Sequence, residues 1–559
     1  MNKPLSEYPR PQLYRDSYLS LNGEWEYAFS NSSKIPVNWE GKIIVPYSPE
    51  TKLSGVNRVL QPDEYLFYRL EFSLEELVIK DKVLLHFLGV DQIADVYIND
   101  HYLGQHIGGF LPFEFDIKPY INVDKNILIV RVQDFTDTSY LSRGKQKLKH
   151  GGIWYTPQSG IYFPVFIESV SEDYIKNIKF TPDIDKQEII INIESTSTEA
   201  GIHIFGIDRP IETNKDVHIK VKDMHLWSNE DPYLYFVKAY TPNDEVTSYF
   251  AMRKYSVIED EQGIKRLALN NRPIFMKGVL DQGYYSDGLL TPGSYEDYIK
   301  DIELVKSLGF NTIRKHIKIE IPRWYFECDK RGIIVWQDFI NGGEKYKFST
   351  IAFPLITNIH HNDHNYRKFS RLNRTGREQA KQEFNDTISY LYNCPCIGLW
   401  TIFNEGWGQF DSKEIYEQLH QLDPTRIYDH ASGWHDQGAS ETKSLHVYFK
   451  PVKLKKASKT SQRAIILSEF GGFLLQIKDH MMKGRKTYKV FNDYSKWLEQ
   501  YRTSINRDVI ANIPKGLSAC IYTQLSDVEE ELNGFVTFDR EVVKVNVKDI
   551  KEINDIIKL

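Results

Sequence analysis

From about residue 259 onward, short apolar runs alternate with helical stretches, and this alternation limits the possible folds more than any other feature of the sequence. Strands that alternate with helices favour a parallel sheet, because a parallel connection needs a long crossover. The expected strands are Ile274–Val279, Thr312–His316, Ile333–Phe339, Ile397–Phe403, Arg426–His430, Leu445–Phe449, Ile465–Glu469 and Ser518–Gln524. Eight strand–helix units in ~300 residues predict a (β/α)8 barrel.

The helices between these strands carry end signals. Ser294 with Asp297 fits a capping box, and Gly309 is a natural C-terminal glycine for the helix between them. A second helix is expected around Arg323–Lys330, before Gly332, and a third near Arg377–Tyr392. The third follows a polar insertion of roughly 30 residues, which we expect to lie beside the barrel mouth.

The first 258 residues contain short β-prone runs and no amphipathic helix of any length. Strands are expected at Gly23–Phe29, Leu66–Phe72, Val83–Phe87, Ala94–Ile98, Ile127–Val132, Asn177–Phe180 and Glu188–Ile193. Strands at hairpin spacing predict a β-sandwich for residues 1–175. Residues 176–258 have the length of an immunoglobulin-like sandwich, and residues 259–559 hold the barrel.

Composition excludes several classes of protein. Hydrophobic residues make up 41% and charged residues 26%, and the net charge is −6 with the two signs intermixed, so nucleic acid is not an expected partner. The first residues lack a signal-peptide core and no run reaches ~18 apolar residues, so we expect a cytoplasmic protein without a membrane span. The four cysteines, Cys328, Cys394, Cys396 and Cys520, are expected to be reduced structural thiols.

Two of the eight strands end on a glutamate. Glu405 follows the apolar run Ile397–Phe403, and Glu469 closes Ile465–Glu469. These are the fourth and seventh strands, whose C-terminal ends face each other across the mouth of a closed barrel. A retaining glycosidase needs one carboxylic acid to protonate the leaving oxygen and one carboxylate to attack, with roughly 5 Å between the carboxyl groups. The pair is therefore a candidate for glycosidic-bond hydrolysis.

The two glutamates need different pKa values for these roles. An apolar surround such as Trp400 and Trp407 should raise the pKa of Glu405. A cation or hydrogen-bond donors should lower the pKa of Glu469, and Arg314 on the second strand and Tyr448 on the sixth are the expected donors.

Several motifs together resemble glycoside hydrolase family 2, which contains β-galactosidases, β-glucuronidases and β-mannosidases. Asn404-Glu405 resembles the acid/base motif of that family, Glu469 in Ser-Glu-Phe-Gly its nucleophile, and Asn311–His316 its second-strand arginine and histidine motif. Upstream, the matching segments are Leu21–Trp25, Gly151–Tyr155, Ser159–Tyr162 and Trp227–Tyr235. The resemblance covers essentially the whole chain.

The resemblance implies a sugar-binding-like jelly roll for residues 1–175 and a retaining exo-acting β-glycosidase with a carbohydrate substrate. It implies Glu405 as acid/base, Glu469 as nucleophile, and Asn404 as the partner of the sugar 2-hydroxyl. Neither a cofactor nor a metal is expected, and a homo-oligomer is expected on this analogy alone. Residues expected to bind the substrate or support the site are Asn404, Arg314, His316, Tyr448, Trp434, Asp281, Gln282 and Gln524.

Departures from the family pattern bear on the sugar. After the first strand, Asp281 and Gln282 stand where the family commonly has Arg-His, and Gln524 stands where a tryptophan is common. The region Glu531–Arg540 lacks the Asn-x-Lys element with which glucuronidases of the family bind the substrate carboxylate. A β-galactosidase is therefore favoured, while β-glucuronidase, β-mannosidase and arabinosidase activities stay open.

Other roles are also considered for several of these residues. The cluster His360–His364 could bind a metal, but a flexible wall of the substrate cleft is favoured. The acidic run Asp527–Glu530 is expected to be a solvated loop, with one member possible at the sugar. Trp407 and Trp434 could be packing residues or sugar platforms. The rival class of function is a carbohydrate-binding protein on an inactive barrel, with the jelly roll as its binding domain.

Overall fold

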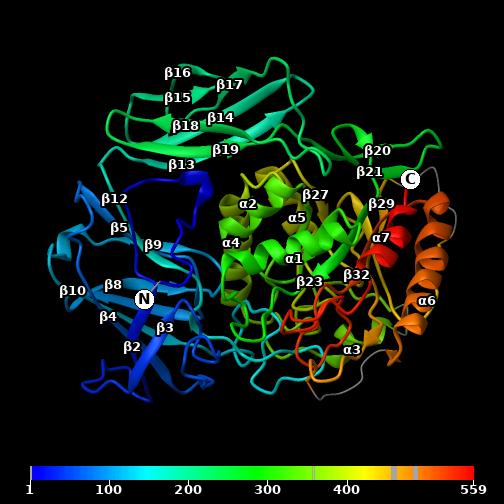
Figure 1. Cartoon of the computed structure of the whole chain (residues 1–559), viewed down its shortest axis with the longest axis horizontal. Coiled ribbons are helices and arrows are strands. Elements are labelled where there is room, and N and C mark those ends of the chain that lie inside the picture. The colour runs from blue at the N-terminus through cyan, green and yellow to red at the C-terminus, as the bar shows by residue number, and fades with distance from the viewer. Residues whose placement is uncertain (1–2, 356, 358, 455–461, 483–488) are drawn as a thin grey trace.

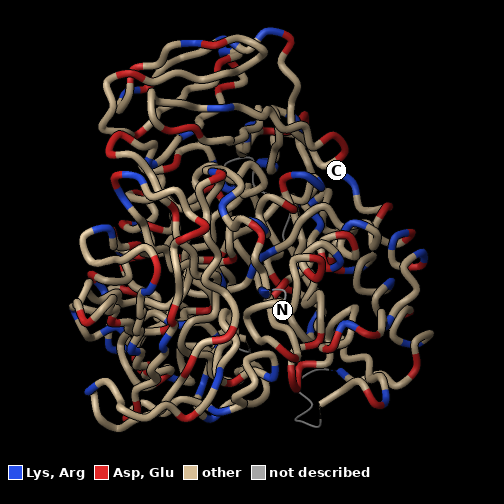
Figure 2. Tube along the Cα trace, turned by 60° about the vertical axis from the view of Figure 1, so that its left-hand side comes forward, with Lys and Arg blue, Asp and Glu red and all other residues tan. Residues whose placement is uncertain are grey.

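We describe the protein from a computed structural model, which covers residues 3–355, 357, 359–454, 462–482 and 489–559. A β-sandwich, a smaller β-sandwich and a (β/α)8 barrel follow one another along the chain, and Figure 1 shows the first sandwich to the left of the barrel and the second above it. Lysines, arginines and acidic residues alternate along the whole trace in Figure 2. Within the described residues, no helix is long and apolar enough to cross a lipid bilayer.

The N-terminal sandwich packs a six-stranded sheet against a four-stranded one. The larger sheet has the order β3 (Gly41–Val45), β2 (Gly23–Ser30), β4 (Tyr65–Phe72), β10 (Asn126–Gln133), β7 (Ile93–Ile98), β8 (His101–Ile107). The smaller has β1 (Tyr18–Ser20), β12 (Val165–Val170), β5 (Lys82–Phe87), β9 (Phe113–Asp116), and β6 (Val90–Asp91) pairs with β11 (Gly160–Ile161). Alternate residues of β10, including Leu128, Val130 and Val132, are buried, which fits a sheet with one face on the core.

The second sandwich packs a three-stranded sheet against a four-stranded one. The first consists of β13 (Ile175–Asp183), β14 (Glu188–Ser195) and β17 (Val217–Lys220). The second consists of β16 (Ile207–Ile211), β15 (Ala200–Ile204), β18 (Tyr235–Tyr240) and β19 (Glu245–Phe250). Its core is rich in isoleucine, and Ile189, Ile191 and Ile193 of β14 all point into it. β-branched side chains pack well on a pleated, half-buried surface.

A small antiparallel sheet links this sandwich to the barrel. It contains β20 (Tyr255–Glu259), β21 (Lys265–Leu269) and β22 (Arg272–Pro273). The expected division between residues 258 and 259 falls inside β20, whose only ladder partner here is β21 on the barrel side. We therefore propose a boundary near residue 254, because a domain boundary belongs where few contacts cross.

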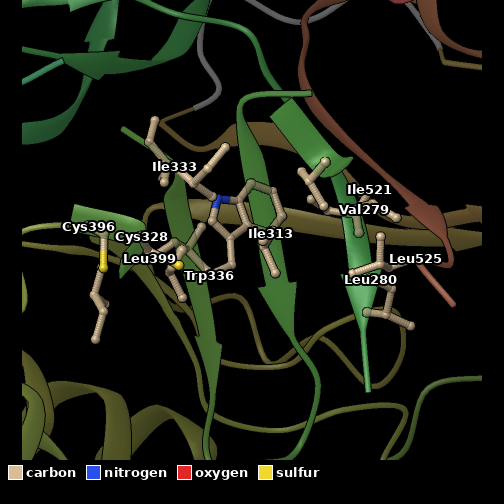
Figure 3. Close-up of a cluster of buried hydrophobic side chains, with 14 of the residues drawn as sticks. Val279, Leu280, Ile313, Cys328, Ile333, Trp336, Cys396, Leu399, Ile521 and Leu525 are labelled. Atoms are coloured by element: carbon tan, nitrogen blue, oxygen red, sulfur yellow. The ribbon is translucent and has the colours of Figure 1, made fainter. Parts of the chain in front are cut away.

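The barrel has all eight strands that the alternation predicts. Their order is β27 (Ile427–Asp429), β26 (Ile397–Thr401), β25 (Ile334–Asp338), β24 (Thr312–Lys315), β23 (Met276–Asp281), β32 (Leu517–Thr523), β29 (Ala464–Gly471), β28 (Thr442–Val447). All neighbouring strands are parallel, and the first and last contact each other, so the sheet is nearly closed. Figure 3 shows side chains of several strands gathered in its core, among them Ile313, Trp336 and Leu399.

Helices cover the barrel. They are α1 (Tyr295–Ser307), α2 (Pro322–Arg331), α3 (Phe348–Ile351), α4 (Arg374–Leu391), α5 (Ser412–Leu422), α6 (Tyr494–Ser504) and α7 (Val547–Asp555). Short helical turns are η1 (Pro11–Leu13), η2 (Lys118–Tyr120), η3 (Phe353–Leu355), η4 (Ile505–Val509) and η5 (Ile510–Lys515), and β30 (Leu474–Leu475) pairs with β31 (Val490–Phe491). The expected capping box of Ser294 and Asp297 begins α1, and Gly332 ends α2 in the left-handed conformation. All four cysteines are free and buried, as expected.

Candidate active site

The two glutamates meet at the C-terminal end of the barrel. Glu405 lies four residues after β26 with a left-handed backbone (φ 50°), a conformation that non-glycine residues adopt mainly where the surroundings impose it. Glu469 lies within β29, whose parallel neighbours are β28 and β32. One carboxylate oxygen of each lies within 4.8 Å of the other and of a ring nitrogen of His446. Both side chains are largely buried, with 12% of Glu405 and 7% of Glu469 exposed.

Both donors expected from the sequence contact Glu469. The hydroxyl of Tyr448 donates to Oε2 at 2.6 Å and also lies 2.9 Å from the hydroxyl of Thr523. The guanidinium of Arg314 donates to Oε1 at 3.2 Å. The carboxylate of Glu469 is therefore held from two sides, and its orientation is fixed before any substrate enters.

Arg314 is fully buried and organises the polar floor of the barrel. Its Nε and one terminal nitrogen bind both oxygens of Asp338 at 3.0 Å, the bidentate geometry that suits a guanidinium and a carboxylate. The same side chain donates to Oδ1 of Asn404 at 2.9 Å. One cation thus links the ends of the second, third, fourth and seventh strands.

The surroundings move the two pKa values in opposite directions. Burial raises the pKa of Glu405, and the nearby charge of Glu469 adds to this, although the hydrogen bond from His446 opposes it. Burial also acts against ionisation of Glu469, but the electrostatic effects of His446 and of the Arg314 guanidinium outweigh it, so the pKa of Glu469 is lowered. The arrangement therefore favours a protonated Glu405, which can donate a proton, beside an ionised Glu469.

Asn404 directly precedes Glu405 and is almost completely buried. Its backbone N–H donates to Oδ1 of Asn341 at 3.0 Å, and its side-chain carbonyl accepts from Arg314. The amide nitrogen Nδ2 has no hydrogen-bond partner in the described structure. A buried donor without a partner destabilises the protein, because its hydrogen bonds to water are lost and not replaced. A ligand hydroxyl would supply the missing acceptor.

His316 and Trp434 lie close to the same polar floor. Nδ1 of His316 lies 2.9 Å from Asp338, and burial lowers the pKa of this imidazole. The ring of His316 lies 6.1 Å from that of Trp407, and the ring of Trp434 lies 6.2 Å from that of His446. Both tryptophans are more than nine-tenths buried. Trp434 borders His446, which contacts both glutamates, and Trp407 borders His316, which contacts Asp338.

The remaining predicted residues form two separate arrangements. Asp281 does not contact the glutamates: its carboxylate accepts from Nζ of Lys315 at 2.6 Å, and Lys315 lies over the ring of Trp324 in α2, outside the strands. Gln282 and Gln524 bind each other at 2.9 Å through their side-chain amides. Gln524 directly follows Thr523, the partner of Tyr448, so this amide pair lies on the Glu469 side of the mouth.

Sequence reasoning missed two members of the site. Nδ1 of His446 lies 2.8 Å from Oε1 of Glu405 and 3.5 Å from Oε2 of Glu469, and Nε2 lies 3.0 Å from the Ser432 hydroxyl. The available signal was its spacing, because His446 and Tyr448 are two residues apart in the expected strand Leu445–Phe449, which would place both on the same face. Asp338 was also visible as an acid at the end of a third apolar strand.

The acidic run after β32 is not a solvated loop, so that expectation is wrong. Asp527 is buried and accepts from Lys544 at 2.6 Å, and Glu529 is buried against the backbone of Thr156. The neighbouring Glu531 binds the Tyr155 hydroxyl. Burial of these acids arises because a loop of the N-terminal sandwich packs onto the barrel mouth, which a reading of single segments cannot show.

The histidine cluster of the insertion after β25 is dispersed. His361 stacks on His435 with ring centroids 5.3 Å apart, while Nδ1 of His364 lies 3.1 Å from Asp411. Among the described residues, neither His360 nor these two belongs to a group of ligand atoms close enough to share a metal ion. Asp363 of the same segment accepts hydrogen bonds from Gln409 and from the backbone of Ser412, so the segment packs beside the loop that follows Glu405.

Comparison with known proteins places the chain in a family. Residues 55–167 match the sugar binding domain of glycosyl hydrolases family 2, and residues 261–558 match the TIM barrel domain of the same family. The β-galactosidase of Thermoanaerobacter pseudethanolicus is 25% identical over 446 residues, which are 73% of this chain and 54% of that protein. A putative β-glucuronidase of Formosa agariphila is 23% identical over 74% of this chain and 48% of that protein.

The chain thus spans about half the length of the curated relatives it matches. Solved structures share the fold over nearly the whole chain. A family 2 β-galacturonidase from Eisenbergiella tayi bound to galacturonate has a TM-score of 0.72 at 19% identity, with 98% of this chain and 99% of that chain covered. A β-glucuronidase from Lactobacillus rhamnosus has a TM-score of 0.74 at 15% identity, with 98% of each chain covered. The chain belongs to glycosyl hydrolase family 2.

Proposed function

We propose that the protein is a retaining β-glycosidase that removes a terminal β-linked sugar by double displacement. The observation that carries the proposal is the pair Glu405 and Glu469, whose nearest carboxylate oxygens lie within 4.8 Å and whose pKa values are displaced in opposite directions. Retaining glycosidases hold their carboxyl groups roughly 5 Å apart, whereas inverting enzymes need room for a water molecule between carboxylate and sugar.

In the first step the protonated carboxyl of Glu405 gives its proton to the glycosidic oxygen, while the carboxylate of Glu469 attacks the anomeric carbon and forms an ester bond to the sugar. In the second step Glu405, now ionised, takes a proton from water, whose oxygen attacks the same carbon and releases Glu469. Arg314 and Tyr448 keep Glu469 ionised and oriented. The free amide N–H of Asn404 is the expected donor to the 2-hydroxyl of the sugar.

For the sugar itself we propose a neutral glycone, and we favour a β-galactoside as the substrate. The segment Glu531–Arg540, which we match to the region of the glucuronidase element, contains no lysine. The cations that follow in the same loop are occupied: Lys544 pairs with Asp527 at 2.6 Å, and Arg540 pairs with Asp301 at 3.2 Å. The alternatives are a β-glucuronide, which the names of two curated relatives and of several solved structures favour, and a β-mannoside.

The test is a panel of aryl β-glycosides (galactoside, glucuronide, mannoside, glucoside and fucoside) with the wild type and Glu469→Gln. Hydrolysis of one glycoside that is lost in the variant supports the enzyme and names its sugar. If the glucuronide alone is hydrolysed, the neutral glycone is wrong. If the folded wild type hydrolyses none but binds free sugars in calorimetry, the rival class, a carbohydrate-binding protein, replaces the glycosidase.

A further inference from the structure

A second cavity opens beside the candidate active site. It has a volume of about 730 Å³ and lies between a loop of the N-terminal sandwich and the segment before α3. Arg143, Lys147 and Trp154 line it from the sandwich side, and Glu344, Lys345 and Tyr346 from the barrel side. The cavity is lined by three cations, two on the sandwich side and one on the barrel side, which distinguishes it from the polar groups around Glu469 and Arg314.

Arg143 is the unexplained member of this wall. Its side chain is only 4% exposed, and its guanidinium lies over the ring of Tyr346 at 4.3 Å. Nε and one terminal nitrogen have no hydrogen-bond partner, and among the described residues no carboxylate oxygen lies within 4.0 Å of this guanidinium. A buried charge is normally paired, because its desolvation costs free energy. These two nitrogens are therefore available to donate hydrogen bonds to a bound ligand.

The cavity has an excess of positive charge near Arg143. Burial, together with the charges of Arg143 and Lys345, lowers the pKa of Lys147 to about 8, although Asp137 opposes them. Nζ of Lys147 lies 3.6 Å above the ring of Trp154. Two acids, Asp137 and Glu344, also line the cavity, so three cations and two carboxylates face it. A bound anion would offset the electrostatic repulsion between these cations.

Aromatic rings connect this cavity with Glu405. Trp407, two residues after Glu405, has its ring 4.9 Å from that of Trp154 and 6.2 Å from that of Tyr346. The group that leaves during hydrolysis departs from the side of the proton donor. A leaving group that extends past Trp407 therefore meets the rings and cations of this cavity, and aromatic faces suit sugar rings.

We propose that this cavity binds the leaving-group part of the substrate and that Arg143 and Lys147 recognise a carboxylate on it, as on a uronic acid residue. The planar guanidinium matches a carboxylate in shape, and Lys147 adds a point charge. This inference rests on the proposed glycosidase function and deepens it: the glycone is neutral and the sugar beyond the cleaved bond is acidic.

The experiment compares two leaving groups on the glycone that the enzyme accepts, 4-methylumbelliferone and 3-carboxyumbelliferone. In Arg143→Gln and in Lys147→Met, KM for the carboxylated glycoside is expected to rise roughly 10-fold or more, the scale of a hydrogen bond to a charged group. The kcat of that substrate and both constants of the methyl substrate should stay within about 2-fold, because neither side chain touches the bond that breaks.

Lys149→Met is the matched control, since Lys149 lies in the same loop but is exposed and outside the cavity wall. Melting temperatures verify that each variant is folded, and Lys147→Met decides alone if Arg143→Gln does not fold. Equal effects on both substrates, or no effect on either, would overturn the inference while the glycosidase stands. A wild type silent on both substrates would overturn the proposed function itself.

Discussion

Nδ1 of His446 lies 2.8 Å from Oε1 of Glu405. The same nitrogen lies 3.5 Å from Oε2 of Glu469, so one imidazole contacts both candidate catalytic carboxylates. Ser432 lies 3.0 Å from the other ring nitrogen and orients the ring. His446 thus influences the ionisation of both the proton donor and the nucleophile, although it forms no covalent bond in the proposed reaction.

Replacing His446 by Asn is expected to move the pH profile of kcat/KM to higher pH. Activity requires Glu405 protonated and Glu469 ionised, so it falls at low pH as Glu469 gains a proton and at high pH as Glu405 loses one. His446 lowers the pKa of both carboxyls, and its loss raises both. At neutral pH we expect a loss of roughly 10- to 150-fold, equivalent to a hydrogen bond of about 1.5–3 kcal/mol to a charged group.

The pH profile of His203→Asn, an exposed histidine on β15, serves as the control and should match the wild type. If His446→Asn loses activity but keeps both limbs of the profile in place, His446 acts only in packing.

Arg314→Met is expected to destabilise the fold and to move the acidic limb of the profile to higher pH. The change leaves Asp338 and Glu469 buried without their common cation, which should lower the free energy of unfolding by about 3–5 kcal/mol in urea titration. Without Arg314 the pKa of Glu469 rises, so the nucleophile protonates at a higher pH. Arg374→Met on the exposed face of α4 should change neither quantity. An unchanged acidic limb in Arg314→Met would show that Arg314 does not control Glu469.

The roles of the two glutamates can be separated with azide. In Glu405→Ala the enzyme is expected to form the glycosyl-enzyme, and azide, which needs no base, should then release the β-glycosyl azide. The rate with glycosides of poor leaving groups should fall roughly 10²- to 10⁴-fold, the usual contribution of acid–base catalysis. In Glu469→Ala turnover should vanish and no β-azide should form. Product analysis that gives the β-azide from Glu469→Ala would reverse the two roles.

Treatment with EDTA is expected to leave activity unchanged. Oxygens of Glu405 and Glu469 and a nitrogen of His446 are close enough to ligate a cation, but a metal bound there would occupy both the proton donor and the nucleophile. The measurement is the rate before and after dialysis against EDTA, with added Zn²⁺ as the reverse experiment. A rate that falls on chelation and returns with Zn²⁺ would give this trio a metal-binding role.

The barrel could be predicted because its signals are local. Several of the eight strands are short apolar runs, and Ser294, Gly309 and Gly332 mark helix ends within a few residues. The same locality exposed Glu405 and Glu469, which end two of these runs. Arg314 and Tyr448 could be chosen as partners because the strand order of a barrel is fixed.

The rest depends on contacts between segments far apart in the sequence. Asp281 was expected beside the substrate, yet its buried carboxylate pairs with Lys315 on the neighbouring strand, which lies over Trp324 of α2. The acids Asp527 and Glu529 looked solvated because their run is polar, but Lys544 and a loop of the N-terminal sandwich bury them. His446 was not identified from the sequence, because its role depends on its contacts with Glu405 and Glu469, which are distant in sequence.

The most direct test of the central claim is the stereochemistry of hydrolysis, followed by proton NMR during the first minutes with the glycoside chosen from the panel. Two carboxyl groups as close as Glu405 and Glu469 predict a covalent intermediate and two inversions. The account therefore predicts that the β-anomer of the free sugar appears first and the α-anomer only later by mutarotation. Initial release of the α-anomer would contradict it, since a single displacement by water would then be the mechanism.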